Sequence, residues 1–189
     1  MIKVLCREFG MVWALGLSVM IASAGLVFSG AVVHVPVVDR GFPGSWLAAS
    51  GAALLAWYML RPRWQREVAQ LVRARWHRAV VIVSVAILVG LALLPIAFHS
   101  VDVYEVTLYP LLFATAVIGA IAAGNLGWAP ILVVSLGAQT ANNVSLREVS
   151  QWVNLHADLV VSVGAVVLLG ALVFYVWHGA VAGFPSPDD

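Results

Sequence analysis

The largest group of residues that could bind a partner is the basic segment 61–78. It contains six of the ten Lys and Arg residues of the chain. Apolar residues recur every three to four positions between Trp64 and Trp76, while Arg66 and Arg73 fall on other faces. This pattern is typical of an amphipathic helix that presents guanidinium groups on one side. Two interpretations remain open: the helix binds anionic lipid headgroups, or it docks on a protein partner.

Five histidines require that a haem or metal site be considered. A bis-histidine haem needs two histidines that face each other in the middle of neighbouring helices, and these histidines lie instead at or beyond the ends of apolar stretches or in the basic segment. The single cysteine, Cys6, provides neither a thiol pair nor a cysteine-rich metal site. The sequence therefore predicts no metal site and no cofactor. The histidines are His34, His77, His99, His156 and His178.

Sequence motifs of catalysis are also missing. The chain has no G-x-S-x-G nucleophile motif, no H-E-x-x-H pair and no phosphate-binding P-loop. No Asp or Glu interrupts the long apolar stretches, where proton-coupled pumps carry carboxylates. We therefore expect no catalytic residues and no enzyme activity, and any ATP-driven work must be powered by another chain.

Six long apolar stretches must position these polar segments. The chain of 189 residues is 62% hydrophobic and only 10% charged, whereas about a quarter of the residues in soluble domains are charged. A helix needs ~20 apolar residues to cross the hydrocarbon core of a bilayer. The sequence predicts an all-α, polytopic membrane bundle in a single domain, with a short amphipathic helix before the first span. The predicted spans are residues 11–33, 45–60, 79–98, 106–123, 126–141 and 159–177.

Charge asymmetry predicts the orientation of this bundle. Lys3, Arg7 and the segment 61–78 hold eight of the ten basic residues, and basic connections stay in the cytoplasm. We expect a protein of the bacterial cytoplasmic (inner) membrane with both termini cytoplasmic and a polar extracytoplasmic segment at residues 139–158. Tryptophans near span ends are predicted to anchor the bundle at the membrane interface. These are Trp64, Trp76, Trp128 and Trp177.

In its organisation the chain resembles the permease subunits of type-2 ABC exporters. The resemblance rests on the charged lead-in at residues 3–8, the basic segment 61–78 and the polar segment 139–158. It implies that 61–78 is a cytoplasmic coupling helix seated on a separate ATPase subunit, and that a second copy or a related permease completes the complex. Membrane lipids are the other expected partner, and no nucleic acid is expected. The residues implied to contact the ATPase are Arg66, Glu67, Arg73 and Arg75.

Two further functions remain open at this stage. A solute-capturing membrane subunit of the energy-coupling-factor type also has about six spans in a chain of this size. It holds a vitamin or a metal in a pocket open to the outside, whereas an exporter permease moves amphiphiles through a dimer interface. The other alternative is a structural or assembly subunit of a larger membrane complex.

Overall fold

The computed structural model describes six segments of the chain, which are residues 11–28, 31–35, 40–60, 74–94, 103–140 and 147–179. Most of these residues are helical, and one short hairpin interrupts them. The helices are α2 (Met11–Phe28), α3 (Gly44–Leu60), α5 (Ala74–Leu93), α6 (Val103–Ala122), the 3-10 turn η3 (Gly124–Leu126), α7 (Trp128–Thr140), α8 (Arg147–Leu155) and α9 (Ala157–His178).

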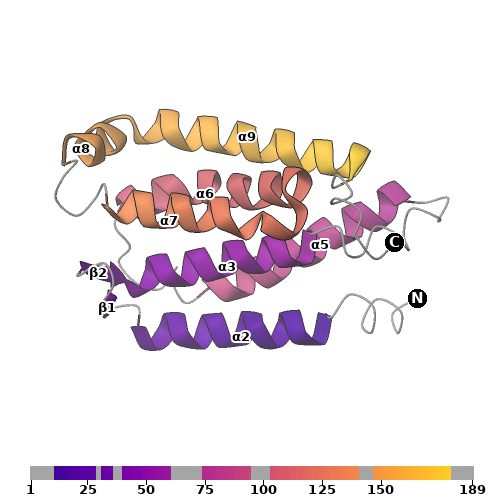
Figure 1. The fold of residues 1–189 in the computed structure, drawn as a ribbon, viewed down its shortest axis with the longest axis horizontal. Helices are drawn as coiled ribbons and strands as arrows, with labels where there is room; N and C mark the ends of the chain where they lie inside the picture. Colours follow the sequence, from indigo (N-terminus) through magenta and orange to yellow (C-terminus); the bar gives the residue numbers. More distant parts are fainter. Residues whose placement is uncertain are drawn as a thin grey trace.

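The long helices run alongside one another, and successive ones point in opposite directions (Figure 1). The hairpin and α8 lie at one end of the bundle, which we call the hairpin end. The start of α2, the start of α5 and the end of α9 lie at the other end (Figure 1). We call this the arginine end because α5 carries Arg75 and Arg78 there.

The centre of the bundle is α3, which packs against α2, α5, α6 and α7. Most of its residues are buried, and many of them are alanines. Ala49 and Ala53 on α3, together with Ala116 and Ala120 on α6, are almost completely buried. Small side chains of this kind let helix backbones approach closely.

A tight turn joins α6 to α7 at the arginine end. Gly124 has a φ of 50°, a conformation that glycine adopts without steric cost. The backbones of Gly119 and Gly127 pack directly against each other. A Cβ added to Gly119 would lie 2.6 Å from the carbonyl oxygen of Gly127, so no side chain fits there. Trp57 of α3 donates a hydrogen bond from Nε1 to the Gly124 carbonyl oxygen at 2.9 Å. The turn is therefore fixed against the central helix.

Each predicted span overlaps one long helix, but the helix ends differ from the prediction. The hairpin of β1 (Val32–Val35) and β2 (Arg40–Pro43) pairs antiparallel, with Val32 opposite Pro43. The predicted first span ended with Val32 and Val33. These residues are β-branched and also favour strands. The all-α prediction is confirmed apart from this short hairpin, which was not predicted. In α6 the helix begins at Val103, three residues before the predicted span.

Two predicted amphipathic segments lie wholly or largely outside the described residues. These are the N-terminal helix before residue 11 and residues 61–73 of the basic segment. The described remainder of the basic segment, 74–78, is the first part of α5 and is continuous with it. In the polar segment 139–158, the helix α8 lies at the hairpin end (Figure 1).

Two described helices, α6 and α9, are long and apolar enough to cross a membrane, and α2, α3 and the apolar part of α5 are shorter apolar helices. About half of the apolar window in α6 is buried, whereas most of α9 is exposed. Large apolar side chains cover the outer faces of α2 and α9. On α2 they include Val12, Trp13, Val19, Met20 and Val27, and on α9 Leu159, Val166, Leu169, Val173, Phe174 and Trp177.

Candidate functional site

Polar side chains from three helices gather at the hairpin end of the bundle. Helices α3 and α6 begin at this end and α7 ends there (Figure 1), so the first turns of two helices meet the last turns of the third. We call the group the polar cluster. Its members are Ser45, Trp46 and Ser50 of α3, Tyr104, Glu105 and Tyr109 of α6, and Ser135 and Gln139 of α7.

Glu105 supplies the carboxyl group of the polar cluster. Its side chain is only 2% exposed, and Ser45 Oγ donates a hydrogen bond to its Oε2 at 2.6 Å, a short distance typical of hydrogen bonds to carboxylates. Burying a carboxylate is costly, so such groups are often functional. The sequence analysis placed Glu105 in a connection, whereas the structure places it in the first turn of α6. The reason is that α6 begins earlier than the apolar stretch.

Trp46 and Ser135 form the fully hydrogen-bonded part of the cluster. Trp46 is completely buried, and its Nε1 donates to the carbonyl oxygen of Ser135 at 3.1 Å and to its Oγ at 3.0 Å. The hydroxyl groups of Ser50 and Ser135 share a further hydrogen bond of 2.6 Å. These bonds hold α3 and α7 in a defined register.

Two tyrosines of α6 close the cluster on its other side. Tyr104 donates from its hydroxyl group to the carbonyl oxygen of Ala138 at 2.9 Å, which ties α6 to α7. Tyr109 stacks on Trp46 with 6.1 Å between the ring centroids. Its hydroxyl oxygen is buried and has no hydrogen-bond partner among the described residues.

Gln139 is the residue that points most directly to a ligand. It is 1% exposed, and neither Oε1 nor Nε2 has a hydrogen-bond partner among the described residues. It lies one turn from Ser135, on the same face of α7. An unpaired buried polar group costs about 1–3 kcal/mol. A polar group of a ligand beside Gln139 would supply the hydrogen bonds that its amide lacks.

The described part of the chain holds no group of three or more His, Cys, Asp or Glu residues close enough to bind a metal ion. His156 stacks on Trp152 at 4.6 Å between centroids, and His178 stacks on Phe174 at 4.3 Å. The polar cluster contributes one carboxyl group, one amide group, and hydroxyl groups. Its chemistry is that of hydrogen bonding and of holding a proton or a cationic group.

The residues predicted from sequence lie at the arginine end where they are described. Arg75 is exposed and its guanidinium group lies 4.3 Å above the ring of Trp177. Trp76, Trp128 and Trp177 are exposed near the same end. The predicted contacts Trp64, Arg66, Glu67 and Arg73 lie outside the described residues.

Sequence reasoning missed the polar cluster altogether. The available signal was that Glu105 directly precedes one apolar stretch and Gln139 lies near the end of another, where the pattern alone cannot show whether a side chain turns inward. Comparison of the chain with protein-family models, curated proteins and solved structures finds no significant match. The function is therefore argued from the chain's own residues.

Proposed function

We propose that this chain is a polytopic subunit of a membrane transport system and that its polar cluster binds a small polar solute. The observation that carries the proposal is the pair Glu105 and Gln139, both buried near one end of an apolar bundle. Ionisable groups buried among membrane helices most often serve transport or binding. No nucleotide-binding motif occurs in the sequence, so a separate chain supplies the energy.

The outer surface of the bundle supports a membrane location. Large apolar side chains cover the faces of α2 and α9 that point away from the core, and soluble proteins rarely expose apolar patches of this extent. Both α6 and α9 are long enough to cross a bilayer. The shorter apolar helices span the bilayer where the bilayer thins locally, or where the side chains that flank each helix reach the interface.

The position of the polar cluster favours a solute-capturing subunit. Its residues come from three helices of one copy, whereas an export path between two copies needs polar groups at a dimer interface. Glu105 accepts hydrogen bonds and attracts positive charge, and the Gln139 amide both donates and accepts. The ligand class that fits is a small polar molecule with an amine or several hydrogen-bond donors.

An exporter permease is the second candidate. Arg75 and Trp76 are exposed at the arginine end, opposite the polar cluster, where a cytoplasmic ATPase subunit would dock. In this function Arg66, Glu67 and Arg73 contact the same subunit. The two candidates share the membrane location and the separate energising chain, and they differ in what the polar cluster does.

Native mass spectrometry of the full-length chain, purified in a mild detergent, tests the solute-binding function. We expect the wild-type protein to carry a small polar ligand from the cell. Glu105→Gln and Gln139→Leu should each weaken its retention at least about tenfold, because the first removes the negative charge that attracts a cationic group and the second removes the hydrogen bonds of the amide. Glu148→Gln is the matched control, since Glu148 is exposed on α8 and should not alter retention.

The same purification identifies the partner chains. An ATPase that co-purifies, together with a ligand that both variants retain unchanged, would contradict solute capture and favour the exporter. Recovery of the chain with neither ligand nor ATPase, within a larger complex, would favour the assembly role.

A further inference from the structure

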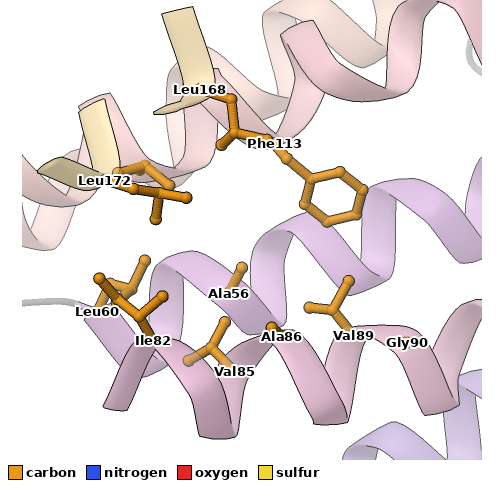
Figure 2. Close-up of a pocket in the computed structure, with 11 residues that line it drawn as sticks. Ala56, Leu60, Ile82, Val85, Ala86, Val89, Gly90, Phe113, Leu168 and Leu172 are labelled. Carbon is orange, nitrogen blue, oxygen red and sulfur yellow. The ribbon is translucent and has the colours of Figure 1, made fainter. Parts of the chain in front are cut away.

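A cavity of about 290 Å³ lies between α3, α5, α6 and α9. The α3 residues that line it are Ala56 and Leu60, near the C-terminal end of the helix. The polar cluster lies elsewhere, on the first turns of the same helix. Every lining side chain is apolar, and the sticks in Figure 2 show only carbon. Leu168 and Leu172 of α9 face the α5 residues across the opening (Figure 2).

The shape of the cavity fits a hydrocarbon chain. Along α5 its lining extends from Ile82 to Gly90, which is about 12 Å of helix at 1.5 Å per residue. Its volume lies at or below the lower limit of ordinary small-molecule pockets, roughly 300 Å³. The lining offers no hydrogen bond to a polar ligand. Empty apolar cavities are destabilising, and apolar molecules bind in them.

Two arginines lie beyond one end of this cavity. Arg75 precedes Arg78 by three residues and Arg78 precedes Ile82 by four, so all three share one face of α5. Arg78 Nη1 donates hydrogen bonds to the carbonyl oxygens of Val176 at 3.1 Å and Trp177 at 3.2 Å. These bonds hold the guanidinium group between α5 and α9, the two helices that form opposite walls of the cavity.

Both guanidinium groups retain capacity to bind an anion. Arg78 Nε is buried and has no hydrogen-bond partner among the described residues. Arg75 is exposed, and its contact with the Trp177 ring leaves its N–H groups available at the edge of the guanidinium plane. The cavity therefore combines a hydrocarbon-lined interior with a cationic rim, which is the complement of an anionic amphiphile.

We propose that this cavity binds one acyl chain of an anionic phospholipid whose phosphate group contacts Arg75 and Arg78. The inference rests on the membrane location proposed above and is independent of the polar cluster. The basic segment places the arginine end in the cytoplasmic leaflet, where anionic headgroups are attracted to basic residues close to the surface. The bound lipid fills the gap between α5 and α9 and fastens the two helices together.

Native mass spectrometry with defined lipids tests the proposal. The full-length protein in detergent is titrated with phosphatidylglycerol or with phosphatidylcholine of the same acyl chains. We expect one tightly held phosphatidylglycerol per protein. Arg75→Gln should reduce the preference for phosphatidylglycerol about fivefold, which is the effect of one basic residue near a membrane surface.

Filling the cavity provides the second variant. A Cβ added to Gly90 meets no atom within 4 Å, so Gly90→Leu enters the cavity without a backbone clash and should abolish the tightly held lipid. Gly16→Leu is the matched control, because Gly16 on α2 is equally open and does not line the cavity. This control should bind the lipid as the wild-type chain does.

The outcomes separate this inference from the proposed function. A membrane-inserted wild-type chain that binds both lipids equally, or a Gly90→Leu variant that still holds phosphatidylglycerol, would overturn the lipid site alone. A wild-type chain that stays soluble without detergent would overturn the membrane location, and the lipid site with it.

Discussion

Gln139 and Ser135 lie one turn apart on α7, and their side chains differ in hydrogen bonding. Ser135 is bonded to both Trp46 and Ser50, so it contributes to packing and register. Gln139 is equally buried but lacks hydrogen-bond partners among the described residues. A residue that costs stability and adds no internal bond is typical of a binding site, where stability and function oppose each other.

This difference predicts the effect of one substitution on stability. Gln139→Leu should raise the free energy of unfolding by about 1–2 kcal/mol, because it replaces an unsatisfied buried amide with an apolar side chain of similar size. Denaturant titration of the detergent-solubilised protein, freed of bound ligand, measures the change. Gln151→Leu on the exposed face of α8 is the control and should have little effect. A clear loss of stability in Gln139→Leu would mean that the amide is bonded within the ligand-free protein.

At the scale of elements, the contact between α6 and α7 depends on the absence of side chains in their turn. Gly119 and Gly127 touch backbone to backbone, and Trp57 Nε1 lies close to the position a Cβ of Gly127 would take. The same indole group donates to Gly124. One turn of chain therefore couples α3, α6 and α7, the three helices that also form the polar cluster.

Adding one methyl group to this turn should destabilise the bundle. Gly127→Ala forces its Cβ against the Gly119 backbone and displaces the Trp57 indole, at an expected cost of about 1–3 kcal/mol. Thermal unfolding followed by circular dichroism measures it. Gly137→Ala provides the comparison, since a Cβ there meets no atom within 4 Å and alanine favours helix. Equal melting temperatures for the two variants would contradict the tight packing of the turn.

At the scale of the whole molecule, the two ends of the bundle have different chemistry. The hairpin end carries the polar cluster and α8, and the arginine end carries Arg75, Arg78 and the exposed tryptophans Trp13, Trp76, Trp128 and Trp177. The proposed function would place the solute site on one side of the membrane and the contacts with lipid headgroups and a partner on the other. The apolar faces of α2 and α9 connect the two ends.

The orientation of the ends can be measured by cysteine labelling in intact cells. In a Cys6→Ser background, Glu148→Cys on α8 should react with a membrane-impermeant maleimide added outside. Trp76→Cys at the arginine end should react only after the cells are permeabilised, because basic connections stay in the cytoplasm. Both positions are exposed in the structure. The reverse pattern would invert the proposed topology, and labelling of both positions from outside would contradict a membrane-spanning bundle.

The apolar stretches located the long helices because hydrophobic runs of this length are unambiguous. The predicted helix ends differ from the observed ones by several residues, because helix ends depend on caps and contacts that a hydropathy pattern does not contain. The hairpin at Val32–Val35 was missed because a short apolar strand after an apolar helix has no separate periodic signal.

The sequence by itself determined the composition of an apolar, mostly helical chain, the approximate positions of its helices and the concentration of positive charge near one end. These are local properties that each segment carries alone. The burial of Glu105, the missing hydrogen bonds of Gln139 and the carbon-lined cavity beside Arg78 were decided only by the tertiary structure. Each of them depends on which face of one helix meets another, and that is set by the packing of segments far apart in the chain.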